Sequence, residues 1–119
     1  MIEKASRNFL RKRRHTRIRR KLSGTSEVPR LSVYKSLRHV YAQLIDDIEG
    51  KTLISASSKE KGFETGGTMI EKSKKVGSLL AQRMKDKSMN TLVFDRGGYK
   101  YHGRIAALAE TMREAGIQF

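Results

Sequence analysis

The chain has no cysteine, only one proline (Pro29) and no long apolar run among its 119 residues. The lack of cysteine excludes disulfide bonds and cysteine-based zinc sites, and it suits a reducing compartment. A membrane-spanning helix needs roughly 20 consecutive apolar residues, and no segment approaches that length. The basic N-terminus lacks the apolar stretch of a signal peptide, and its serine content is low for a transit peptide. We therefore expect a cytoplasmic protein that does not enter a membrane.

Acidic residues are also scarce: 12 Asp and Glu stand against 26 Lys and Arg, so the net charge is +14. Residues 1–22 hold ten of these basic residues and one acid, Glu3, which gives this short segment a charge of +9. A positive charge concentrated in a tail is typical of proteins that bind a polyanion. Nucleic acid is the first candidate partner, and an anionic membrane surface is the second.

Residues 1–24 are predicted to form a basic, partly disordered arm ahead of a globular domain at 25–119. The arm favours a helix by propensity, because it has no Pro or Gly between residues 7 and 22. Its apolar stripe is too thin to dock firmly on a core, and its closely spaced like charges oppose a helix in isolation. We expect the arm to fray when free and to become helical when phosphates neutralise it.

Three β-strands are predicted at the start of the globular domain, at residues 30–36, 40–46 and 52–57. Apolar and polar residues alternate in the first of them, and β-prone residues dominate the other two. Their short connections predict an antiparallel meander.

The second half of the domain is predicted to be helix, strand and helix. Thr68 and Glu71 fit a capping box, followed by apolar residues at helical spacing to about Asp86. On that helix, Gly77 would allow a close approach to the sheet. The run at 91–94 is predicted to be a buried parallel strand, and a last helix follows it. The fold class is thus α/β (mixed α+β) in the order β-β-β-α-β-α, with about four strands in one mixed sheet and helices packed on it.

The segment FDRGGYKYHGR at residues 94–104 is the first candidate site. It follows a buried strand and precedes a helix, a position where α/β sheets place ligands. Its glycines would let the backbone approach a phosphate, its cations supply charge, and its aromatic rings can stack on bases. The alternative is a structural turn with solvated cations and tyrosines buried by the sheet.

The turn YKSLRH at residues 34–39 is the second candidate site. It places Lys35, Arg38 and His39 beside the hydroxyl groups of Ser32 and Ser36, all of which can hydrogen-bond phosphate or a 2′-hydroxyl. An ordinary polar hairpin is the alternative interpretation of this turn.

Catalysis and mononucleotide binding have little support in the sequence. Neither glycine-rich nucleotide motif is present, and no acidic residue lies near His102 at triad-like spacing. No converging set of histidines and carboxylates predicts a metal site, so no cofactor or metal is expected.

Two long motifs then carry a family resemblance, RLSVYKSLRHVYAQLIDD at residues 30–47 and FDRGGYKYHGR, with REAGIQF at the end. The chain resembles the bacterial-type eighteenth protein of the large ribosomal subunit, a family that binds 5S rRNA. The resemblance covers nearly the whole chain. Two positions depart from the usual pattern of the family: Tyr34 is often Phe there, and Leu37 is often Asn.

The resemblance implies a non-enzymatic protein of the central protuberance that binds 5S rRNA and helps attach it to 23S rRNA. It also implies neighbouring 5S rRNA-binding ribosomal proteins as partners, and we expect a monomer in the free state. RNA contacts are expected from the arm, from the first turn with strand residues before it, and from the second loop: Arg11, Arg13, Arg14, Arg17, Arg20 and Lys21; Arg30, Ser32, Lys35, Ser36, Arg38 and His39; Arg96, Gly97, Gly98, Tyr99, Lys100, Tyr101, His102 and Arg104.

Three other functions stay open at this point. The family's body resembles the ribonuclease H-like arrangement, but a nuclease needs several carboxylates around a divalent metal, and the acids here are mostly scattered. A membrane-surface role would need a clearer apolar face on the arm. A DNA-compacting protein would also use such an arm.

Overall fold

The structure is a computed structural model that describes residues 7–19, 23–60, 67–96 and 98–119. Its elements are α1 (Arg7–Arg19), β1 (Arg30–Lys35), β2 (Val40–Asp46), β3 (Lys51–Ser57), α2 (Met69–Asp86), β4 (Val93–Asp95) and α3 (Arg104–Glu114). This order confirms the predicted α/β fold with its N-terminal helical arm. Within the described ranges, no helix has the length and apolar character that crossing a membrane requires.

The four strands form one mixed sheet in the order β3-β2-β1-β4. The first three strands are antiparallel to their neighbours and β4 is parallel to β1, so the predicted meander and parallel strand are both confirmed. The fourth strand was predicted at residues 91–94 but lies at Val93–Asp95. The shift arises because the preceding residues pair with the C-terminal segment, where Leu92 N–H donates to the Gln118 carbonyl.

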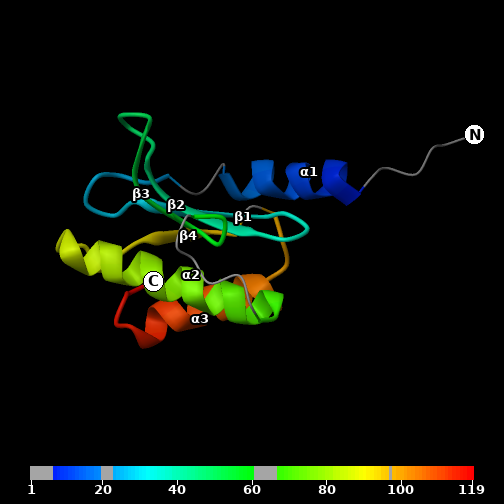
Figure 1. Cartoon of the computed structure of the whole chain (residues 1–119). Coiled ribbons are helices and arrows are strands. Elements are labelled where there is room, and N and C mark those ends of the chain that lie inside the picture. Colours follow the sequence, from blue (N-terminus) through cyan, green and yellow to red (C-terminus); the bar gives the residue numbers. More distant parts are fainter. Residues whose placement is uncertain (1–6, 20–22, 61–66, 97) are drawn as a thin grey trace, which may run out of the picture.

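The sheet separates two helical layers, with α1 on one face and α2 and α3 on the other (Figure 1). Alternating residues of the strands point into the core between the sheet and the α2–α3 layer. The fully buried large side chains of this core include Leu31, Val40, Leu44, Val76, Leu80, Met84, Ile105, Leu108 and Met112. The predicted apolar faces of both C-terminal helices are therefore confirmed.

Helix α2 begins at the predicted capping box, in which Thr68 Oγ1 accepts from Glu71 N–H and the Glu71 carboxylate accepts from Thr68 N–H. The prediction for Gly77 was wrong, because this glycine faces α3 and not the sheet. An added Cβ would lie 2.8 Å from the carbonyl oxygen of Leu108 and 3.4 Å from Thr111 Cβ. Gly77 thus allows the two helices to pack closely against each other.

Strand β3 lies at one edge of the sheet, and basic side chains of α2 contact its backbone. Arg83 donates to the Ser55 carbonyl and Lys87 donates to the Leu53 carbonyl. Arg83 also pairs with the Glu60 carboxylate at 2.9 Å, which fixes its guanidinium beside the strand.

Arg30, at the start of β1, lies at the centre of a buried network of ion pairs. Its guanidinium donates to both Asp47 oxygens, at 2.9 and 3.1 Å, and to Asp95 Oδ2 at 2.7 Å. Asp47 follows β2 and also accepts from Gly24 N–H at 2.7 Å, whereas Asp95 ends β4 and is fully buried. Burial alone would lower the pKa of Arg30, but its hydrogen bonds and ionic contacts with both carboxylates raise it overall. The network therefore joins β1, β2 and β4 at one end of the sheet.

Helix α1 is attached to the same two carboxylates. His15 Nε2 lies 2.8 Å from Asp95 Oδ2, and Arg19 contacts both oxygens of Asp47 at 3.4 Å. None of the thirteen residues of α1, all of them described, is buried. The arm helix thus lies against the domain through polar contacts, and its expected fraying in the free chain stays a prediction.

Replacing Gly77 by Val should destabilise the domain, because the added methyl groups meet the backbone of α3. Overpacking of this kind costs about 1–3 kcal/mol. Urea unfolding of Gly77→Val should show this loss beyond that of Ser78→Val, which places the same β-branched residue at an exposed position of the same helix. Equal unfolding free energies of the two variants would contradict the close α2–α3 contact.

Stability should fall as the pH falls from about 5 to 2, in part because of Asp47. Hydrogen bonds from Arg30 lower the pKa of Asp47 from 3.8 to about 2 in the folded chain. The folded state then binds fewer protons than the unfolded state in this range, so unfolding becomes easier on acidification, by about 2 kcal/mol in all.

Urea unfolding at several pH values should reveal this contribution as a shallower pH dependence in Asp47→Asn. Glu49→Gln is the control, because its ion pair with Lys51 is solvent-exposed and such pairs contribute little. A pH dependence that stays the same in Asp47→Asn would exclude Asp47 as its source.

Candidate nucleic-acid interface

The two candidate sites predicted separately from the sequence lie side by side in the structure. Because β1 and β4 are parallel neighbours, the turn after β1 and the loop after β4 emerge at the same end of the sheet. Arg104 donates to the Ser36 carbonyl at 2.9 Å, and the Tyr99 hydroxyl donates to the Lys35 carbonyl at 3.4 Å. The two segments therefore form one surface.

The arm helix completes this surface. The Arg14 guanidinium donates to the Gly98 carbonyl at 2.9 Å. The Tyr99 ring has two cationic neighbours: the Arg11 guanidinium carbon lies 4.7 Å and Lys35 Nζ lies 5.0 Å from its centroid. Such cation–π contacts fix the position of the ring and hold two positive charges close together.

A hollow of about 680 Å³ opens between α1, the start of α2 and the loop before α3. We call it the basic hollow. Five cationic side chains and no carboxylate contribute to its lining, which consists of Arg7, Leu10, Arg14, Lys35, Ile70, Tyr99, Lys100, His102, Gly103 and Arg104.

The pKa of the Lys35 ammonium group reflects both its burial and the positive charge of the basic hollow. Burial and, after it, the nearby charge of Arg104 lower the pKa of the Lys35 ammonium group. A bound anion would act against both effects, because it would stabilise the charged ammonium and offset the repulsion between the two cations. The basic hollow therefore suits a phosphate group or another anion.

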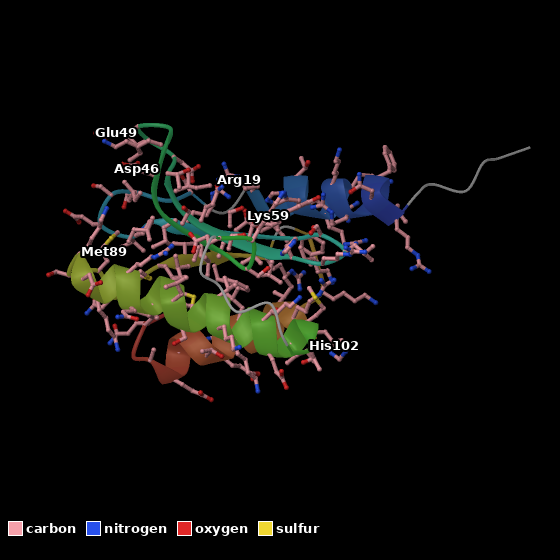
Figure 2. All side chains as sticks on the ribbon, viewed as in Figure 1. Arg19, Asp46, Glu49, Lys59, Met89 and His102 are labelled. Atoms are coloured by element: carbon pink, nitrogen blue, oxygen red, sulfur yellow. The ribbon has the colours of Figure 1, made fainter. Side chains whose placement is uncertain are left out.

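The acidic residues of the turn after β2 lie far from the basic hollow. Figure 2 shows Asp46 and Glu49 at one end of the molecule, and His102 at the other end, beside the start of α2. Asp46 accepts from the N–H groups of Ile48 and Glu49, so it shapes its own turn. Within the described ranges no group of three or more His, Asp or Glu side chains converges as a metal site would require.

Nine of the predicted RNA-binding residues meet at this surface: Arg11, Arg14, Lys35, Ser36, Gly98, Tyr99, Lys100, His102 and Arg104. Arg13, Arg17, Arg38 and Arg96 are exposed elsewhere, and Ser32 lies on the face of the sheet that carries α1. Tyr101 accepts from Arg113 and packs edge-on against Phe94, and His39 hydrogen-bonds Ser58. Arg20, Lys21 and Gly97 fall outside the described residues.

The expectation that Arg30 contacts RNA is corrected by the structure. Its side chain is only 8% exposed, and its guanidinium is occupied by Asp47 and Asp95. In a sequence, an arginine that pairs with a buried carboxylate looks the same as one that binds phosphate. Arg30 is a structural residue of the sheet.

Gly98 also has a different neighbour from the one predicted. A Cβ at this position would meet the Arg11 carbonyl oxygen and lie 2.9 Å from the amide nitrogen of His15. The glycine at this position allows a close backbone approach to α1, and its contact with a phosphate stays a prediction. The loop after β4 therefore positions the arm helix.

Sequence reasoning missed the contribution of Asp95 and His15. Their signal was present but weak: one carboxylate ends an apolar strand, and one histidine stands among the arginines of the arm. The pairing spans 80 positions of sequence and became visible only with the fold.

Comparison with known proteins identifies the family. A model of the ribosomal L18 proteins of archaea, bacteria, mitochondria and chloroplasts matches residues 5–119. The chain is 53% identical to the large ribosomal subunit protein uL18 of Lysinibacillus sphaericus and 56% identical to that of Clostridium botulinum strain Langeland, each over 119 residues that cover both chains completely. It is also 53% identical to the uL18 protein of Solibacter usitatus over the same full length. The resemblance seen in the sequence motifs is confirmed, and the chain belongs to the ribosomal L18 family.

Proposed function

We propose that this protein binds 5S rRNA and helps attach it to 23S rRNA in the central protuberance of the large ribosomal subunit. Members of the L18 family are ribosomal proteins and not enzymes, and the curated relatives are named as proteins of the large subunit. The protein would therefore act in the cytoplasm as part of a ribonucleoprotein, beside other proteins that bind 5S rRNA.

The basic hollow is the observation that carries this proposal. Its cations come from α1, from the end of β1 and from the segment before α3, so three separate elements present positive charge to one ligand. Folded RNA offers phosphates from several strands at once. A concave basic surface therefore suits folded RNA better than it suits a single extended RNA strand. Among the residues that the structure describes, no carboxylate that would repel the phosphates lines this hollow.

The arm and the domain have different roles in this proposal. Residues 1–24 supply long-range attraction and release counterions from the RNA as they bind, because most of the excess charge lies there. The turn after β1 and the loop before α3 recognise the shape of the folded RNA. The polar contacts of α1 with Gly98 and Asp95 would hold part of the arm beside the basic hollow in the bound state.

A direct competition tests the function. The full-length protein should bind 5S rRNA at least about tenfold more tightly than duplex DNA or an unrelated folded RNA of equal length at physiological salt. Equal affinity for the three nucleic acids would indicate charge attraction alone. Stronger binding to anionic lipid vesicles than to any RNA would favour a role at a membrane surface.

Replacing Lys100 by Gln should weaken 5S rRNA binding and reduce its salt dependence. Lys100 is an exposed cation in the lining of the basic hollow, and a lysine that contacts one phosphate contributes about 0.7 to 0.9 to the slope of log K against log salt. Filter binding or fluorescence anisotropy at several salt concentrations would measure the change.

Lys85→Gln is the matched control for this measurement. Lys85 is an exposed lysine in the last turn of α2, roughly 20 Å along the helix from Ile70, which lines the basic hollow. This variant should keep the slope of the parent protein. Equal changes in both variants would mean that the lysines attract RNA without forming a defined site.

A further inference from the structure

Two cross-strand residue pairs form an exposed polar patch on the face of the sheet that carries α1. Tyr34 of β1 lies opposite Tyr41 of β2, and Ser32 lies opposite Gln43. These four residues line a shallow hollow of about 320 Å³, which we call the tyrosine hollow. The intervening residues of both strands point the other way, into the core.

The rings of Tyr34 and Tyr41 project outward from this face of the sheet and do not pack into the core. Tyr34 is 53% exposed, and its ring centroid lies 5.8 Å from that of Tyr41 at an interplanar angle of 41°. His39 packs edge-on against Tyr41 at 6.4 Å and is itself held by Ser58, so the Tyr41 ring is supported from behind. Ring faces that are exposed and held in place are the feature that unpaired bases use for stacking.

Positive charge adjoins these rings on the side of α1. A second hollow, of about 380 Å³, lies between Tyr34 and the arm helix, and its cationic lining comprises Arg7, Arg11, Arg14 and Lys35. The Tyr34 ring belongs to both hollows. An uncharged hollow with hydrogen-bonding groups thus opens directly beside a positively charged one.

This juxtaposition matches the two parts of a nucleotide. A base has a flat face and polar edges, which suit the rings and the hydroxyl and amide groups, whereas its phosphate suits the arginines and lysine. A fully paired duplex keeps its bases stacked within the helix and can offer this surface only its backbone. A peptide partner would need both acidic groups opposite the arginines and a flat side chain against the tyrosine rings, whereas a single nucleotide supplies both features.

We propose that Tyr34 and Tyr41 form a stacking platform for one unpaired nucleotide of the bound RNA. Ser32 and Gln43 hydrogen-bond the edge of its base, and cations of the neighbouring hollow, Arg11 and Lys35 among them, hold its phosphate. This inference rests on the proposed function, because it requires that the protein binds RNA. It adds the open face of the sheet to the proposed RNA-binding surface.

The test compares single-stranded and duplex RNA as ligands of the full-length protein. Tyr34→Leu keeps an apolar side chain but removes the ring, so it should weaken binding of a single-stranded oligonucleotide roughly 5- to 100-fold. The affinity of Tyr34→Leu for a fully paired duplex with the same number of phosphates should not change. Tyr34→Phe keeps the ring and should bind both RNAs as the parent does.

Two further readouts separate stacking from charge attraction. The fluorescence of 2-aminopurine in the oligonucleotide should be quenched on binding to the parent and much less on binding to Tyr34→Leu. The slope of log K against log salt should stay unchanged in Tyr34→Leu, because a stacked ring releases no counterions.

Phe119→Leu is the matched control, because Phe119 also carries a partly exposed aromatic ring but packs against Phe94 and Arg113 and lines neither hollow of the platform. It should bind both RNAs as the parent does. Tyr41→Leu gives a second test of the platform if its unfolding curve matches that of the parent.

The outcomes distinguish this inference from the proposed function. The stacking proposal would be wrong if Tyr34→Leu bound the oligonucleotide as the parent does, or if it lost equal affinity for single strand and duplex. This face of the sheet would then be available to a protein partner. If the parent shows no preference for 5S rRNA over other folded RNA, the proposed function fails, while the oligonucleotide comparison still decides whether the rings stack on bases.

Discussion

The arrangement of the whole molecule depends on one guanidinium held between two carboxylates. Arg30 contacts Asp47 and Asp95 from the start of the first strand, and these three side chains come from three different strands or strand ends. Removing one partner would leave an uncompensated buried charge, which typically costs several kcal/mol. The same carboxylates also hold the arm helix through His15 and Arg19. The sheet, the arm and the candidate RNA-binding surface are thus connected through a few polar side chains.

This connection explains how a strongly cationic segment can lie on a cationic protein. Apolar burial does not hold α1, because none of its residues is buried. The carboxylates contact the middle and the C-terminal end of the helix, through His15 and Arg19, whereas Arg7 at its start and Arg14 line the basic hollow. Attraction at one end and accumulated positive charge at the other give the arm a fixed orientation. The side of the arm that lines the basic hollow therefore keeps its positive charge.

Much of the fold could be predicted because it depends on local patterns. The alternation in β1, the capping box at Thr68 and the apolar faces of α2 and α3 are each set by residues a few positions apart, and each was confirmed. The start of β4 was misplaced because the residues before it pair with the C-terminal segment, which is distant in sequence. Gly77 was assigned to the wrong partner for the same reason: a sequence shows that space is needed, but not which element fills it.

The types of residue in the candidate site could be predicted from the sequence. Their arrangement in space could not. Sequence reasoning found both loops and the arm, and the structure joins them around Tyr99. It counted Arg30 as an RNA contact, because charge alone does not show whether a cation pairs inside the protein. It passed over Tyr41 and Gln43, since their value comes from the register that sets them opposite Tyr34 and Ser32. Register is a property of two strands and cannot be seen in one.

The contacts of Arg83 and Lys87 with the backbone of β3 have a consequence for the protein outside the ribosome. An unprotected edge strand is a template on which another copy can add its own strand, and such addition leads to aggregation. Here two carbonyl groups of the edge strand, those of Leu53 and Ser55, are already occupied by cations of the same chain. A second copy would have to displace both side chains and bring its own large positive charge close to them. The edge of the sheet thereby protects a newly made protein from self-association until it meets its RNA.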